Sequence, residues 1–318
     1  MNRDWFASRD KCPNTGLYCR VERDSVSPDG KRLTTFVITF PRIILCEVNT
    51  HCALSKNTSS SRAIPYARPK GERKPGQPPT MREMVLENPY MPMHWGRNEK
   101  GMQASTELNP DEIAKCKKGI EALRTHTVAQ CDVLWEYGMH KQDINRYLEP
   151  WAWTTQVITG TEWANFYALR TDRFAHPAFQ LISRMMFLRM RASVPKLLAV
   201  GEWHLPFTDE EDYARWKISD LKRISVSRTA RVSYNTMDGV RDTAKDFDLY
   251  DKLIASFPKH MSPTTHQGTP WGNGTVNRSN FVGWNQLRKE ITGENITMFN
   301  PTETELLEWG LSGNEWED

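Results

Sequence analysis

The sequence predicts an α+β protein, because one strand-like segment is accompanied by several segments in which apolar residues recur at helical spacing. Residues 35–46 are rich in β-branched and aromatic residues, which favours a strand. Helical patterns cover residues 109–138, 162–170, 177–194 and 246–257. The chain has 318 residues, 38% of them hydrophobic, so it is long enough to bury a sizeable core.

The longest predicted helix carries signals at both ends. Asn109 is a capping residue, Pro110 suits the first helical position, and the acidic residues after it suit the first turn. Gly138 is a stop signal. We therefore expect a helix from Pro110 to just before Gly138.

Prolines mark the ends of two further helices. Pro195 should end the helix 177–194 near Val194, because proline lacks an amide donor and crowds the preceding turn. The helix 246–257 should end before Pro258.

A cluster of hydroxyl, amide, imidazole and guanidinium side chains at residues 50–62 directly follows the predicted strand. We expect it to open as a loop at the end of that strand, where binding sites are common. Such groups suit an anionic nucleotide, although a serine-rich turn before a helix is the simpler alternative.

This cluster resembles the signature of the flavin-dependent thymidylate synthases. That signature reads Arg-His-Arg, two spacers, Ser, one spacer, Asn, two residues, Ser, one spacer and Arg. The residues in register with it are His51, Ser55, Asn57, Ser60 and Arg62. The two flanking arginines are replaced by Thr50 and Cys52, which removes two guanidinium groups that the resemblance would direct at flavin and folate.

A second segment resembles the part of the same family that contacts nucleotide. Arg146 and Arg170 match its arginines, and Asn165 matches a flavin-contacting asparagine. The planar fork of arginine can hold a phosphate or the carbonyl edge of a uracil. Alternatively, both arginines are surface residues paired with Glu149 and Glu162.

Two elements near the carboxyl end, residues 227–234 and 260–266, resemble elements that precede the strand and signature in this family. No second copy precedes Thr35, so the resemblance implies a circularly permuted chain. Residues 1–206 would hold the strand, signature loop and helical part, and residues 207–318 the permuted segment of the same domain plus an acidic tail. His266 would match a histidine near flavin and folate, or else it is a loop histidine with satisfied hydrogen bonds.

The resemblance implies a twisted, mainly antiparallel sheet with a bundle of long helices. It also implies methylation of dUMP at C5, with methylenetetrahydrofolate as carbon donor, hydride from reduced FAD, and NADPH to reduce the flavin. Because the family builds each active site from several subunits, it implies a homotetramer.

The residue roles that the resemblance implies fall into two groups. Ser60, Arg62, Arg146 and Arg170 would bind dUMP, with Arg170 as the catalytic residue. The flavin or folate would contact Thr50, His51, Cys52, Ser55, Asn57, Asn165 and His266.

There are two alternatives to the synthase, of which Thr50 and Cys52 motivate the first. One is a pyrimidine nucleotide hydroxymethylase, acting on dUMP or dCMP, in which water rather than hydride traps the one-carbon unit. The other is a catalytically inactive homologue that binds nucleotide. Cys52 is either a nucleophile with a lowered pKa or, more commonly for a free cysteine, a packing residue.

Composition excludes several other classes. A net charge of +3 does not indicate a nucleic-acid-binding protein, and the six cysteines show no Cys-x-x-Cys spacing that would suggest a metal site. There is no apolar signal core and no run of about eighteen apolar residues, so we expect a cytoplasmic protein without a membrane partner. The proline-rich basic run 68–79 should be an exposed loop.

Overall fold

The computed structural model describes residues 16–68, 73, 77–234, 242–272, 279–295 and 301–308. Its centre is a five-stranded sheet in the order β3-β4-β2-β1-β5. The strands are β1 (Tyr18–Val26), β2 (Arg32–Pro41), β3 (Ser55–Thr58), β4 (Trp153–Gly160) and β5 (Lys196–Leu197). All neighbouring pairs are antiparallel except β1 with β5. The predicted α+β class with a mainly antiparallel sheet is therefore confirmed.

In the described part of the chain, the helices fall between and after the strands. The first group is α1 (Leu45–Asn49), α2 (Met81–Glu87), α3 (Pro110–Glu136), α4 (Lys141–Leu148), α5 (Ala164–Arg170) and α6 (Pro177–Ala192). The second group is α7 (Glu210–Arg215), α8 (Ile218–Tyr234), α9 (Thr243–Ala255) and α10 (Glu303–Glu308). A two-stranded sheet of β6 (Gly268–Pro270) and β7 (Trp284–Gln286) completes the described part.

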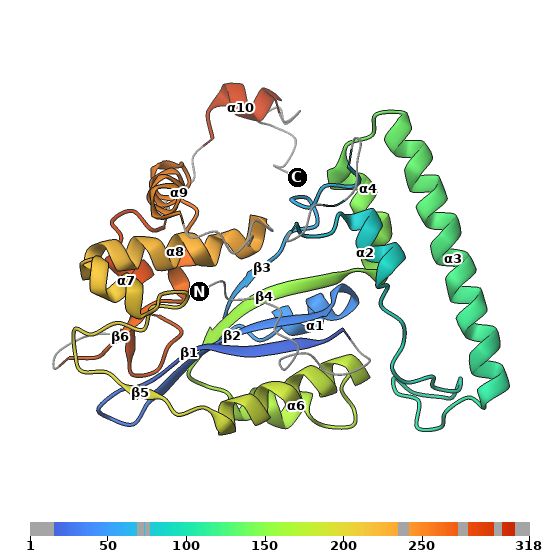
Figure 1. Cartoon of the computed structure of the whole chain (residues 1–318), viewed down its shortest axis with the longest axis horizontal. Helices are drawn as coiled ribbons and strands as arrows, with labels where there is room; N and C mark the ends of the chain where they lie inside the picture. Colours follow the sequence, from blue (N-terminus) through green and yellow to red (C-terminus); the bar gives the residue numbers. More distant parts are fainter. Residues whose placement is uncertain are drawn as a thin grey trace, which may run out of the picture.

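The sheet lies between two helical layers, with α6 on one face and α8 on the other (Figure 1). Side chains alternate along β2, so that one face carries Phe36, Ile38 and Phe40 and the other carries Thr35, Val37 and Thr39. The aromatic face packs against Phe166 of α5 and Phe179 of α6. On the other face, Val37 packs with Val232 of α8.

Helix α3 begins and ends as its sequence signals predict. Asn109 and Glu112 form a capping box, and Gly138 after the helix adopts a φ of 85°, which favours glycine. The expected bundle of long helices is only partly present. The carboxyl-terminal half of α3 packs on α4 and α2 through Val128 and Cys131, whereas Leu123 is 64% exposed. Figure 1 shows α3 running along the outside of the molecule.

The predicted strand 35–46 is wrong in its second half. The strand ends at Pro41, and the chain continues as a 3₁₀ turn, Arg42–Ile44, and then as α1. Ile44 and Val48 are buried at helical spacing, a pattern that a short apolar run does not distinguish from a strand. The proline itself was the available signal for the end of the strand.

The polar stretch after it is not simply an open loop. Residues 55–58 form the edge strand β3, which pairs antiparallel with β4. Ser55 and Asn57 are buried although both are polar, because a side chain and a backbone carbonyl from distant parts of the chain satisfy them. That compensation comes from tertiary structure and has no local sequence signal.

The other predicted helices form with shifted ends. Helix α5 begins two residues later than expected, and α6 ends at Ala192 because Ser193 is already extended ahead of Pro195. Helix α9 begins at Thr243, capped by Asp242, and ends before Pro258. Most of the basic run 68–79 and the end of the acidic tail lie outside the described residues.

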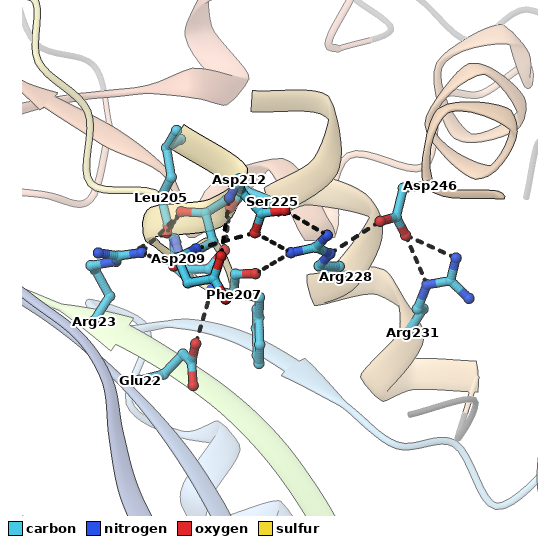
Figure 2. A network of polar contacts seen from close by, with 12 residues as sticks. Glu22, Arg23, Leu205, Phe207, Asp209, Asp212, Ser225, Arg228, Arg231 and Asp246 are labelled. Carbon is cyan, nitrogen blue, oxygen red and sulfur yellow. Dashed lines mark hydrogen bonds and ion pairs between the residues drawn. The ribbon is translucent and has the colours of Figure 1, made fainter. Parts of the chain in front are cut away.

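Buried ion pairs hold the carboxyl-terminal segment together (Figure 2). Arg228 of α8 donates to both carboxylate oxygens of Asp212, at 2.6 and 3.0 Å, and to Asp246 of α9 at 3.0 Å. Arg231 donates to the other oxygen of Asp246, at 2.8 Å. These contacts join α7, α8 and α9 into one unit.

The same unit is fastened to the sheet at Phe207. This residue has a φ of 64°, unusual for a bulky side chain, and is buried. Its N–H donates to Glu22 of β1 at 3.0 Å, and its carbonyl accepts from Arg228 at 2.8 Å. The two bonds, visible in Figure 2, stabilise the strained backbone. In the described part of the chain, no helix is both long and apolar enough to cross a membrane.

Candidate functional site

The signature and the second matched segment meet at one point. Arg170, at the end of α5, donates through Nε to Nε2 of His51 at 2.7 Å and through Nη2 to the hydroxyl of Thr50 at 3.2 Å. Its guanidinium lies 4.8 Å from the ring centroid of Phe179. Arg170 is more than a hundred positions from His51 and Thr50 in sequence, so only the fold brings these three residues together.

His51 is neutral at physiological pH. Burial, the nearby Arg170 and Lys56 together lower its pKa to about 4. Because Nε2 accepts the bond from Arg170, the single ring proton lies on Nδ1. The ring also packs edge-on against Phe166 at 5.0 Å between centroids, which fixes its orientation.

Among the described residues, one edge of the Arg170 guanidinium has no hydrogen-bond partner. The bonds to His51 and Thr50 use the edge formed by Nε and Nη2. The other edge, formed by Nη1 and the second N–H of Nη2, remains a planar pair of donors. Thr50 is different, because its only hydroxyl proton already goes to the carbonyl of Glu47 at 2.7 Å. In this geometry the Thr50 hydroxyl therefore donates its proton within the chain.

Cys52 and Lys56 flank the same corner. The Cys52 thiol is free and exposed, and Sγ lies 3.6 Å from the carbonyl of Thr50. Burial lowers the pKa of Lys56, whose ammonium donates to the carbonyl of His51. Cys52 is thus a surface group rather than the packing residue that its type suggested.

Ser55 and Asn57 face the carboxyl-terminal segment. The Ser55 hydroxyl accepts from Gln286 of β7 at 3.0 Å, and the Asn57 amide donates to the carbonyl of Thr229 of α8 at 2.9 Å. Both side chains are at least 94% buried. In this structure the two side chains join β3 to β7 and α8, and they thereby position β3 and the residues that follow it.

Ser60, Arg62 and Arg146 lie past the other end of β3. Arg62 and Arg146 are exposed, and Arg146 pairs with Glu149 at 3.3 Å, as the surface alternative predicted. Glu149 also pairs with Nε of Arg42 at 2.9 Å, and Arg42 donates to the Ser59 carbonyl at 3.0 Å. The result is a row of alternating charges between α4 and the end of β3.

Asn145 anchors this second group. Its amide donates to the carbonyls of Ser61 at 2.7 Å and Ile64 at 2.9 Å, which holds α4 against the end of the signature. Within the described ranges, Oδ1 of Asn145 and Oγ of Ser61 are buried without a hydrogen-bond partner. Buried polar atoms of this kind are usually satisfied by water or by a ligand.

The predicted dUMP residues therefore fall into two groups. Arg170 lies with His51 before the start of β3, whereas Ser60, Arg62 and Arg146 lie beyond its end. A four-residue strand is about 13 Å long at 3.3 Å per residue. Within a single chain, β3 thus separates Arg170 from the other residues that the resemblance assigns to dUMP.

Two predicted cofactor residues have opposite environments. Asn165 is exposed on α5. His266 is fully buried, its Nδ1 lies 2.8 Å from the hydroxyl of Thr159, and its Nε2 has no partner among the residues described. Burial lowers the pKa of His266 to about 3, so the ring is neutral.

Sequence reasoning missed Phe179, Arg42 and Asn145. Asn145 directly precedes Arg146 in the sequence, and its polarity there was an available signal. Phe179 and Arg42 gave no such signal, because an aromatic residue in a helix and an arginine after a strand have many ordinary roles.

A separate pocket of about 640 Å³ lies where β1 meets α7, lined by Glu22, Arg23, Lys196, Thr208, Asp209, Glu210, Glu211 and Tyr213. None of the predicted site residues lines it. Arg23 is engaged there with the carbonyls of Leu205 and Thr208, so its charge is largely committed to the fold.

Comparison with known proteins gives distant structural likenesses. The sequence matches no protein-family model and no curated protein. Among solved structures, the UMP/dUMP methylase PolB from Streptomyces cacaoi, bound with 5-Br UMP, aligns over 56% of this chain and 90% of that chain, at 13% identity and a TM-score of 0.41. The same enzyme bound with 5-Br dUMP aligns over 56% and 91%, at 13% identity and a TM-score of 0.40.

A third structure is the flavin-dependent thymidylate synthase ThyX from Helicobacter pylori, complexed with FAD and dUMP. It aligns over 50% of this chain and 67% of that chain, at 18% identity and a TM-score of 0.30. At TM-scores below 0.5, these likenesses assign the chain to no family.

Proposed function

We propose that this protein is a flavin-dependent thymidylate synthase, which methylates dUMP at C5 with methylenetetrahydrofolate. The observation that carries the proposal is the contact of Arg170 with His51 and Thr50. Two segments that match the family's motifs separately in sequence converge there, with one donor edge of the arginine left for a ligand.

In this proposal Arg170 holds the pyrimidine. The donor pair on its outer edge is suited to a uracil carbonyl or a phosphate, and His51 and Phe179 keep the guanidinium plane fixed. A fixed positive charge at a carbonyl stabilises the negative charge that develops there during reaction. Arg62 and Arg146 supply the cations for the phosphate.

The residues present also fit a flavin, which supplies the hydride when bound. The buried Nε2 of His266 has no partner among the described residues, and the exposed amide of Asn165 can donate or accept. Cys52 and Thr50 offer less to the flavin than two arginines would, so we expect binding that is weaker than the signature implies. NADPH and the folate are proposed as co-substrates.

We also infer a circularly permuted chain that works as a homotetramer. The inference is supported by the packing of α8, with the 3₁₀ turn Ser262–Thr265, against β3. Helix α8 and this turn thus lie beside the signature although they follow it in sequence. The separation of Arg170 from Arg146 across β3 favours active sites built from more than one copy.

The visible absorption spectrum of the purified protein, before and after addition of FAD and then dUMP, tests the proposal. We expect a bound-flavin spectrum that changes when dUMP is added. A protein that stays colourless after FAD is added and the excess removed would contradict the synthase.

The mass of the nucleotide product then separates the alternatives. A methyl group added to dUMP supports the synthase. A hydroxymethyl group on dUMP or dCMP would instead identify the hydroxymethylase motivated by Thr50 and Cys52. Binding of dUMP without turnover, with FAD, folate and NADPH all present, would identify an inactive homologue.

A further inference from the structure

Five buried side chains form a continuous row of hydrogen bonds on the face of the sheet that α8 covers. Ser25 lies 2.9 Å from Nδ1 of His204, and Nε2 of His204 lies 2.8 Å from the hydroxyl of Thr35. Thr35 lies 2.8 Å from Thr159, which lies 2.8 Å from Nδ1 of His266. Each side chain is at most 1% exposed. The row links β1, β2, β4 and two later segments of the chain.

Both rings in the row are neutral. Burial is the main cause that lowers the pKa of His204 well below its usual value, and it lowers that of His266 to about 3. Each neutral ring carries one proton, on either Nδ1 or Nε2.

The number of protons available to the row couples the tautomers of the two rings. Three hydrogen bonds join Nε2 of His204 to Nδ1 of His266, and each needs one proton. The hydroxyls of Thr35 and Thr159 supply two, so one ring supplies the third. If His204 supplies it from Nε2, then Nδ1 of His266 is unprotonated and the ring proton of His266 lies on Nε2. If His266 supplies it from Nδ1, then the proton of His204 lies on Nδ1.

The two ends of the row decide which state is favoured. With both protons on Nε2, Ser25 donates to His204, and the Nε2–H of His266 has no acceptor among the described residues. With both protons on Nδ1, His204 donates to Ser25, and the Ser25 hydroxyl proton has no acceptor there. Each state leaves one buried donor unsatisfied, so an acceptor placed at His266 selects the first state.

We propose that Thr35 and Thr159 are positioning residues that force His204 and His266 into the same tautomer. Through them, His204 is a positioning residue for the ring proton of His266. An acceptor at His266 then fixes both rings with their protons on Nε2. The identity of that acceptor as a flavin atom rests on the proposed function, whereas the coupling of the two rings does not.

Ring ¹⁵N chemical shifts of histidine-labelled protein, measured without ligand, test the coupling. We expect His204 and His266 to show the same fraction of the Nε2–H tautomer. Signals are assigned with His204→Gln and His266→Gln, each of which removes one ring. Opposite tautomers in the two rings would overturn the proposal.

Thr159→Val tests whether the coupling passes through the row. Thr159 bonds to Thr35 and His266 but not to His204, so a shift of the His204 ring signals is expected only if the row transmits it. Thr35→Val is the second variant, read at His266, if Thr159→Val does not fold. The control is Thr39→Val, which removes the neighbouring Thr39–Thr155 bond of 3.0 Å on the same two strands. Unchanged His204 signals in Thr159→Val and unchanged His266 signals in Thr35→Val would each refute transmission.

Addition of FAD tests the ligand end separately. If FAD binds, we expect both rings to move together to the Nε2–H tautomer. Bound FAD with both rings unmoved would overturn the choice of acceptor. Failure to bind FAD at all would count against the proposed function, while the ligand-free spectra still decide the coupling.

Discussion

At the scale of single residues, the geometry of arginine sets the candidate site. Arg170 uses one edge of its guanidinium for His51 and Thr50 and keeps the other for a ligand. A lysine would keep the charge but could not serve both edges at once. In the proposed function, ligand binding at this corner therefore depends on the shape of the arginine side chain as much as on its charge.

Arg170→Lys should weaken dUMP binding by about 10- to 100-fold, the equivalent of about 1.5–3 kcal/mol for a charge-assisted hydrogen bond. Isothermal titration calorimetry with dUMP measures the change. The control is Arg173→Lys, because Arg173 lies three residues further on and packs over Phe174 rather than at His51. Equal affinities for Arg170→Lys and the wild type would remove Arg170 from the nucleotide site.

The buried histidines also make stability depend on pH. The folded-state pKa values of His51 and His266 are lowered to about 4 and about 3, and that of His204 is lowered as well. Between these values and 6.5 the unfolded chain binds protons that the folded chain does not, so stability falls as the pH is lowered through this window. Each histidine adds up to about 1.4 kcal/mol per pH unit to that slope.

Urea unfolding between pH 4.5 and 7 checks this dependence. We expect the slope of unfolding free energy against pH to decrease by about one proton in His204→Gln. The control is the same substitution at an exposed position of α3, His126→Gln. A His204→Gln slope equal to that of the wild type would show that His204 does not stay neutral in the fold.

At the scale of elements, the unit of α7, α8 and α9 depends on a few buried charges. Asp246→Asn should lower stability by about 3–5 kcal/mol, because Arg228 and Arg231 would keep their charges without the buried carboxylate that faces them. Asp248→Asn is the matched control on the same helix, since its pair with Lys252 is exposed and should contribute below about 1 kcal/mol. Denaturant unfolding of both variants gives the comparison. Similar losses in the two would show that the buried network does not carry this unit.

At the scale of the whole molecule, the separation of the two arginine groups predicts composite active sites. Arg146→Ala and Arg170→Ala should each abolish thymidylate synthesis in the proposed function. If one site takes Arg170 from one copy and Arg146 from another, co-expressed variants in equal amounts should recover about a quarter of the wild-type activity. Co-expression that recovers nothing would place both arginines in one site of a single copy.

The sequence alone determined the features that depend on local chemistry. It gave the limits of α3, because a cap, a first-turn proline and a terminal glycine act within a few residues. It also indicated the α+β class and the helices α5, α6 and α9, because apolar periodicity reports which side of a segment is buried. The placement of His51 beside Arg170 has no local signal in the sequence, because the two residues meet only in the folded chain.

Tertiary structure decided the rest, because it concerns groups far apart in the chain. The polar residues 55–58 become a strand only when β4 pairs with them and when Gln286 and Thr229 satisfy their side chains. The row from Ser25 to His266 likewise draws on five separate segments, and no periodicity links them. Burial of a polar group is stable only where its partners arrive with the fold, so the sequence specifies these groups but not their connections.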